Sequence, residues 1–233
     1  MIREFQYTFE DLEILPKDIA ELLGFSINAI PDPFPKLIES ALNEAPGLCE
    51  IRAGFKYFDH VEINLTQQNI IIDNQIFTPN KIIFTQIKNA SSIAIFICTA
   101  GKEISNWSKQ LAVTGDDLSS FIFDVIGSLA AEKAREKLEI DLKKDINTLG
   151  LNISDAYSPG YCDWSLSEQQ NLFALLPLNF CGITLTEALL MYPVKSVSGL
   201  IGVGKSMKQK GYQCNWCNDV NCLYSKIKRQ KKN

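Results

Sequence analysis

The order in which hydrophobic patterns follow one another constrains the fold of this chain most. Helical patterns at residues 15–23 and 35–45 precede residues 48–77, where alternation and β-branched residues indicate an antiparallel meander. The continuous apolar run at 93–98 is typical of a strand buried on both faces. Because strands and helices do not alternate regularly, the sequence predicts an α+β fold, a twisted antiparallel sheet with flanking helices.

The rest of the chain adds elements to this sheet. The longest predicted helix spans residues 118–143, and Asp116 and Asp117 lie at its amino end, where acids are favourable. A loop at 158–164 is expected between two helices. The remaining predicted elements are strands at 3–9 and 196–203, helices at 80–88, 103–113 and 166–176, and a helical turn around Glu187.

Length and charge bound the classes of function. A chain of 233 residues accommodates one sizeable core, so we expect a single domain over 1–233, with 207–233 as a cysteine-containing, basic tail. A net charge of -4 and a pI near 5.2 exclude a general attraction to nucleic acid or acidic membranes. Apolar runs are too short to span a bilayer and the amino terminus does not resemble a signal peptide. These features predict a cytoplasmic protein.

The long predicted helix carries two acids where core residues are expected. At 100° per residue, its apolar stripe over 118–129 continues into Glu132 and Glu136. In one interpretation the helix runs out of the core into solvent, where these acids meet Lys133 and Arg135. In the other, the carboxylates lie at the rim of a pocket and accept hydrogen bonds from hydroxyl or ammonium groups of a ligand.

A series of short motifs carries a family resemblance. Ser158-Pro159-Gly160-Tyr161 forms a turn in which glycine permits close approach to the backbone and tyrosine offers a flat ring. Leu185-Thr186-Glu187, Met191-x-Pro193 and Ser196-Val197-Ser198-Gly199 follow in that order. With their spacing, these motifs resemble the activation domain of cobalamin-dependent methionine synthase, and the likeness covers residues 12–224.

The resemblance implies an activity and a site. The family reduces cob(II)alamin and methylates it with S-adenosylmethionine, and the resemblance places Glu132, Ser158, Pro159, Gly160 and Tyr161 around that ligand. The chain has no corrinoid-binding Asp-x-His-x-x-Gly segment, so it is expected to act in trans. The implied partners are a cobalamin-binding methionine synthase or another corrinoid protein, which carries the cobalamin, and an electron-donor protein.

Two departures from the family pattern bear on ligand binding. The family's arginine four residues before the loop glycine, which would pair with the methionyl carboxylate, is Ala156 here. Either Lys195 takes its place or binding is weak or lost. The family's later tyrosine-bearing segment near the adenosine is replaced by Gly202-Val203-Gly204-Lys205.

Residues 199–206 match the phosphate-binding pattern G-x-x-x-x-G-K-[ST]. A true loop of this kind opens a helix, whose amino end faces the phosphate. Only residues 207–210 separate the match from Gly211 and the cysteines, which is too short for that helix. An accidental match within a strand is therefore the favoured interpretation.

Three cysteines, Cys214, Cys217 and Cys222, are concentrated in nine residues. Zinc or an iron–sulfur cluster usually takes four ligands, so Cys162, an exogenous ligand or a partner protein would complete such a site. The alternative is three reduced thiols. A metal would favour a second function, a redox partner protein of a corrinoid methyltransferase that has lost S-adenosylmethionine binding.

Overall fold

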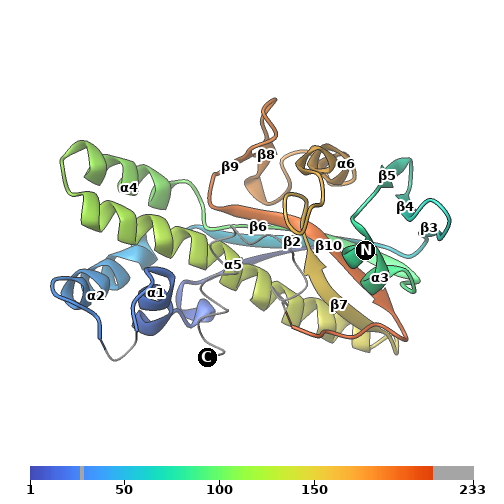
Figure 1. The fold of residues 1–233 in the computed structure, drawn as a ribbon, viewed down its shortest axis with the longest axis horizontal. Coiled ribbons are helices and arrows are strands. Elements are labelled where there is room, and N and C mark those ends of the chain that lie inside the picture. Colours follow the sequence, from blue (N-terminus) through green and yellow to red (C-terminus); the bar gives the residue numbers. More distant parts are fainter. Residues whose placement is uncertain (27–28, 212–233) are drawn as a thin grey trace.

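The computed structural model describes residues 1–26 and 29–211, and a five-stranded sheet forms its centre. Every neighbouring pair in this sheet is antiparallel, which confirms the predicted fold class. Figure 1 shows the sheet with helices around it. In spatial order the strands are β1 (Ile2–Tyr7), β2 (Ile51–Phe58), β6 (Ser92–Thr99), β10 (Ser196–Gly204) and β7 (Asn152–Tyr157).

Strand β6 is the central strand and is buried along its whole length, as its apolar run predicts. Successive side chains of a strand point to opposite faces, so β6 contributes to two cores. Ala94, Phe96 and Cys98 belong to one hydrophobic cluster, and Ile93 and Ile95 belong to the other. The sheet is therefore covered on both faces.

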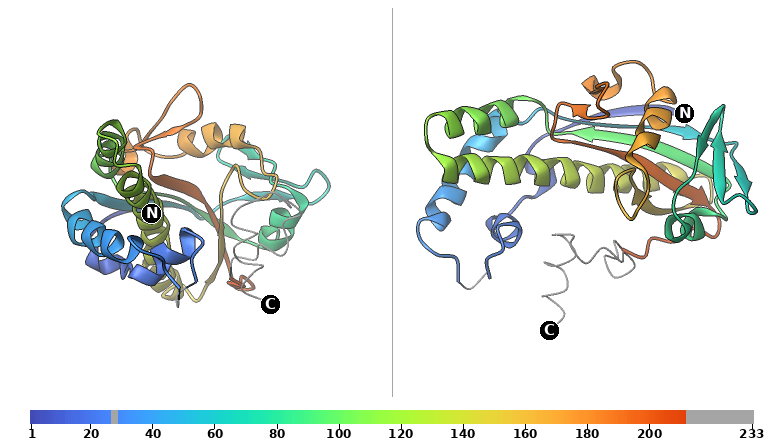
Figure 2. Two further views of the ribbon diagram at one scale, coloured as in Figure 1. Left: turned by 60° about the vertical axis from the view of Figure 1, so that its left-hand side comes forward. Right: turned by 45° about the horizontal axis from the view of Figure 1, so that its top comes forward.

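The first face is covered by helices. Ile19, Ile38 and Ile126 join the cluster of Phe96, so the helices that carry them lie on this face. Figure 2 shows the longest of these, α5, running along the sheet. The elements here are η1 (Glu10–Leu12), α1 (Pro16–Leu22), α2 (Phe34–Glu44), η2 (Ala45–Gly47), α4 (Glu103–Val113) and α5 (Asp117–Asn147).

The opposite face is covered by smaller elements. Ile83 and Leu172 pack with Ile95 in the second cluster. A separate three-stranded sheet and a two-stranded hairpin complete this side. The elements are β3 (Glu62–Asn64), β4 (Asn69–Ile72), β5 (Gln75–Phe77), α3 (Lys81–Ile87), η3 (Leu166–Glu168), α6 (Gln169–Ala174), η4 (Phe180–Gly182), β8 (Thr184–Leu185) and β9 (Met191–Tyr192).

Three predicted features of the strands were wrong. Residues 48–77 do not form one meander, because β2 pairs with β1 and β6 while β3, β4 and β5 form their own sheet. Strand β7 was missed, since its polar sequence Asn-Ile-Ser-Asp-Ala-Tyr has little strand character and depends on pairing with β10. The expected helical turn at Glu187 is the connection of the β8–β9 hairpin.

The predicted apolar stripe of α5 was right only in part, since Ile122 is buried and Val125 and Leu129 pack against the first cluster. Leu118 and Phe121 are exposed, and the buried side chains recur at every fourth residue to the end of the helix. The helix therefore does not run out of the core. In an ideal helix a four-residue row drifts around the axis, and the sheet beneath is twisted, so the buried face follows the sheet. The row comprises Ile122, Ile126, Ala130, Ala134, Leu138, Leu142 and Ile146.

Among residues 1–26 and 29–211, none of the helices combines the length and apolar character needed to cross a membrane.

Candidate functional site

The Pro-Gly-Tyr loop leaves the edge strand β7 and closes on itself. The amide of Gly160 donates to the carbonyl of Trp164 at 2.8 Å, and that of Trp164 donates to the carbonyl of Tyr161 at 3.0 Å. Gly160 has φ of +89°, a conformation that favours glycine. Pro159 is buried, whereas Gly160 and Tyr161 are exposed. The tip of the loop is thus accessible to a ligand.

The base of the loop is anchored on the second face of the sheet. Trp164 is 2% exposed, and its indole nitrogen donates to Glu168 Oε2 at 2.6 Å. Glu168 also accepts from the amide of Thr78 at 2.9 Å. Asn80 Nδ2 donates to the carbonyl of Cys162. These bonds join the loop to η3 and to the end of β5, so its backbone is held in place.

Glu132 lies between Ala130 and Ala134 of the buried row, and therefore on the other side of α5 from that row, with its side chain 40% exposed. Its Oε2 accepts from Arg135 Nε at 3.0 Å, and Arg135 also pairs with Glu139. Burial by itself would lower the pKa of Arg135, but the carboxylates of Glu132 and Glu139 outweigh burial and raise it. Lys133 pairs with Glu136 at 3.0 Å. The ion pairs expected at these acids are present, and Glu132 is still open to solvent.

The base of the loop packs on the second face of the sheet, whereas Glu132 lies on α5, which covers the first face. Gln209 Nε2 donates to Glu139 at 2.9 Å and the next amide along the chain donates to Asp155 at 3.0 Å, so this part of α5 lies near β7. At the other end, Lys195 contacts Ser128. The loop continues β7 from Tyr157 toward the Lys195 end of β10, and Glu132 lies between Ser128 and Glu139 on α5. Whether loop and helix line one ligand site stays a prediction.

Lys195 is a buried lysine at the start of β10. Its Nζ lies 2.7 Å from Asp124 Oδ1 and 2.9 Å from Ser128 Oγ. The side chain crosses α5 at Gly127, where an added Cβ would approach Lys195 Cγ to 3.0 Å. The sequence pointed to Lys195 but not to its partners. The sequence could have indicated Asp124 and Ser128, because they precede Glu132 at four-residue spacing and so lie in the same row of the helix.

The phosphate-loop match lies in a strand, as favoured from the sequence. Residues Ser196–Gly204 form β10, and no helix follows in the described chain up to residue 211. Gly199 is needed for packing, since an added Cβ would collide with the carbonyl of Tyr157 and approach Phe96 to 2.8 Å. Strand pairing therefore accounts for this glycine without a nucleotide.

The cysteines divide into two groups. Cys214, Cys217 and Cys222 lie outside the described residues, so the metal prediction stays untested. Within residues 1–26 and 29–211, no group of three or more His, Cys, Asp or Glu side chains is arranged to hold a metal ion. In the described part of the chain Cys49, Cys98, Cys162 and Cys181 form no disulfide, and burial raises the pKa of both Cys49 and Cys181 to about 12.

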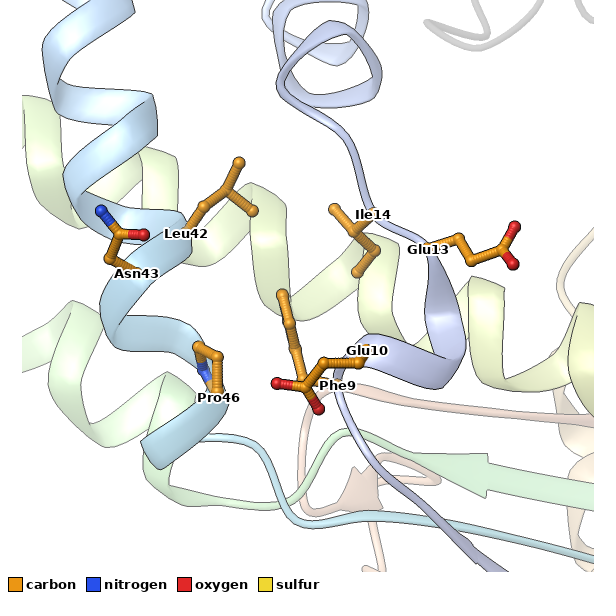
Figure 3. A pocket seen from close by; sticks show the side chains of 7 residues that line it. All are labelled: Phe9, Glu10, Glu13, Ile14, Leu42, Asn43 and Pro46. Atoms are coloured by element: carbon orange, nitrogen blue, oxygen red, sulfur yellow. The ribbon is translucent and has the colours of Figure 1, made fainter.

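Two surface hollows lie elsewhere. Figure 3 shows a pocket of about 380 Å³, in which Phe9, Ile14 and Leu42 lie between the η1 segment and α2 while the carboxylate of Glu13 points away. A second hollow of about 490 Å³ follows α5 and includes Glu136 and Gln209. Neither contains a residue predicted to bind S-adenosylmethionine.

Comparison with known proteins decides the family. A sequence model described as vitamin B12 dependent methionine synthase, activation domain, matches residues 64–221. The chain belongs to this family. The match to the activation domain includes the Pro-Gly-Tyr loop, Glu132 and Lys195. No curated protein sequence matches significantly.

A solved activation-type domain has the same fold. The crystal structure of the MetH reactivation domain bound to AdoHcy aligns with 98% of this chain and 86% of its own, with a TM-score of 0.67. The two sequences are 16% identical. At this identity the alignment supports a shared architecture, in which helices surround a central antiparallel sheet.

Proposed function

We propose that this activation-domain protein binds S-adenosylmethionine and supports the reductive methylation of cob(II)alamin carried by a separate corrinoid protein. The observation that carries the proposal is the family match over residues 64–221, which contains both the exposed loop tip and Glu132. The fold shared with a domain whose structure contains AdoHcy supports the same ligand class.

The side chains suit such a ligand. The exposed carboxylate of Glu132 accepts hydrogen bonds from ammonium or ribose hydroxyl groups. Gly160 allows a ligand to approach the backbone, and the Tyr161 ring offers a face for stacking, while Ser158 and Pro159 shape the turn. Together these residues would hold the sulfonium methyl in line for attack and exclude water, and no general acid or base is required.

The overall reaction needs a partner and an electron. One electron from a donor protein reduces cob(II)alamin to cob(I)alamin, which takes the methyl group from the sulfonium and leaves S-adenosylhomocysteine. We propose that the whole chain, 1–233, acts as one domain in trans on a cobalamin-binding methionine synthase or a similar corrinoid protein. The reduced state of the described cysteines, none of which forms a disulfide, fits the reducing cytoplasm.

Titration calorimetry tests ligand binding directly. We expect S-adenosylmethionine to bind the wild-type chain, and Glu132→Gln to weaken binding by about tenfold, because a hydrogen bond to a charged group is lost. Glu103→Gln, an exposed acid at the start of α4, is the matched control and should bind as the wild type does. An absence of wild-type binding at millimolar ligand would rule the proposal out.

A coupled assay then tests the reaction. The chain is mixed with a corrinoid protein from the same source and a reductant, with and without S-adenosylmethionine, and methylcobalamin is measured from its absorption spectrum. Methylcobalamin should form only when both the chain and S-adenosylmethionine are present. Equal formation without the chain would contradict a role in activation.

A second candidate function rests on Cys214, Cys217 and Cys222. In this alternative the chain is a zinc or iron–sulfur redox partner of a corrinoid methyltransferase and has lost S-adenosylmethionine binding. The uncharged Ala156 favours it, because the family's arginine is missing there. Metal and sulfide analysis of anaerobically purified protein, read together with the calorimetry, separates the two functions.

A further inference from the structure

A lysine ammonium and a glutamate carboxylate lie along one row of α5, the long helix that covers the first face of the sheet. Lys195 is 9% exposed, and its ammonium contacts Asp124 at 2.7 Å and Ser128 at 2.9 Å. Ser128 and Glu132 are four residues apart on α5, so their Cβ atoms are about 5–6 Å apart. The Lys195 ammonium therefore contacts Ser128, which lies one helical turn before Glu132 on α5.

Each charge is positioned by a different set of partners. Asp124 and Ser128 hold Lys195, while Arg135 holds Glu132 from the other side. A buried lysine is costly unless it is paired, so Asp124 fixes its place. The carboxylate of Glu132 and the ammonium of Lys195 are thus oriented along one row before any ligand binds.

An α-amino acid group fits this arrangement. It carries an ammonium and a carboxylate on a single carbon, so it can join an acid and a base that are one turn apart. Its ammonium would donate to Glu132, and its carboxylate would accept from Lys195. The Ser128 hydroxyl accepts from Lys195 and donates to the Asp124 carbonyl at 3.1 Å, so it positions the lysine. The methionyl part of S-adenosylmethionine contains this group.

The other basic groups nearby are less suited to a ligand carboxylate. Arg135 is surrounded by the carboxylates of Glu132, Glu136 and Glu139, and Lys133 is paired with Glu136. A further anion beside Arg135 would meet three like charges. Lys195 pairs with the carboxylate of Asp124, whose side chain is 53% exposed and can turn toward solvent.

We propose that Lys195 binds the methionyl carboxylate of S-adenosylmethionine and that Glu132 binds its ammonium group. This assignment rests on the proposed function. It gives the chain a carboxylate-binding residue although position 156 is an alanine. The basic residue, Lys195, comes from the start of β10, whereas position 156 is in the edge strand β7. Gly127 leaves room for the lysine side chain to cross α5.

The test compares two ligands that differ only in the carboxylate. Binding of S-adenosylmethionine and of decarboxylated S-adenosylmethionine is measured by calorimetry for the wild type, Lys195→Met and Lys205→Met. Lys205 is exposed in the turn after β10 and serves as the control. We expect Lys195→Met to weaken S-adenosylmethionine binding by about ten- to a hundredfold, the effect of one lost hydrogen bond to a charged group. Binding of the decarboxylated ligand should change little.

A second variant guards against misfolding of Lys195→Met. Asp124→Asn keeps an amide oxygen that can hold Lys195 but removes the competing negative charge, so S-adenosylmethionine should bind several-fold more tightly while the decarboxylated ligand does not. Loss of both ligands in a folded Lys195→Met protein, or no preference of the wild type for the carboxylate, would overturn the assignment and leave the proposed function standing. If the wild type binds neither ligand, the proposed function fails and the assignment fails with it.

Discussion

At the scale of single residues, Gly160 and Gly199 are constrained for different reasons, one by its backbone conformation and the other by close packing. Gly160 has φ of +89° and lies at an accessible loop tip, whereas Gly199 is enclosed by Phe96 and the backbone of β7. The sequence pattern singled out both, one in a ligand loop and one in a phosphate-loop match. Only the surroundings of each glycine distinguish a site that a ligand can reach from a packed strand.

Gly160→Ala should lower both stability and ligand affinity. A left-handed conformation costs an L-residue roughly 1–2 kcal/mol, and the added Cβ would lie 3.3 Å from Leu166 Cδ1. We expect urea unfolding to show a loss of about 1–2 kcal/mol and calorimetry to show weaker binding of S-adenosylmethionine. Gly47→Ala is the control, since open space surrounds that position. Equal effects of the two substitutions would contradict this account.

At the scale of elements, α5 organises the first face of the molecule. Its buried row packs on the sheet, and the row of Asp124, Ser128 and Glu132, which is offset by two residues, lies on the other side of the helix. Ala130 and Ala134 belong to the buried row, whereas Gly127 leaves room for Lys195 and Ile104. The same helix therefore supplies stability with one row and candidate ligand contacts with the other.

Leu138→Ala and Ile140→Ala separate these two sides of α5. Leu138 is fully buried, so its truncation leaves a cavity and should lower the free energy of unfolding by about 2–5 kcal/mol. Ile140 is 53% exposed, and its truncation should cost less than about 1 kcal/mol. Urea unfolding followed by circular dichroism measures both. A larger loss for Ile140→Ala would show that the buried row is assigned incorrectly.

At the scale of the whole molecule, the sheet couples two hydrophobic cores. Alternate side chains of β6 enter the cluster under α5 and the cluster under α6, so neither core exists without the same strand. The large sheet and both sets of covering elements are seen together in Figure 2. This arrangement favours one cooperative unit over two independently folding parts.

Two tryptophans on opposite faces report on this cooperativity. Trp107 packs against the first cluster and Trp164 belongs to the second. In a Trp216→Phe background, each variant that keeps only one of these residues should show the same urea midpoint by fluorescence and by circular dichroism, because the shared sheet unfolds once. A fluorescence midpoint that differs from the circular-dichroism midpoint of the same variant would indicate two units.

The sequence by itself determined the α+β class, most helices, the buried central strand and the family. These features depend on local periodicity and short motifs, which are written in neighbouring residues. Strand β7, the partners of β2 and the true buried row of α5 came only from the tertiary structure. Each depends on pairing with β10, β6 or a twisted sheet, and such long-range contacts leave little local signal. The partners of Lys195 were likewise decided in space, where a residue at the start of β10 reaches across α5 to Asp124 and Ser128.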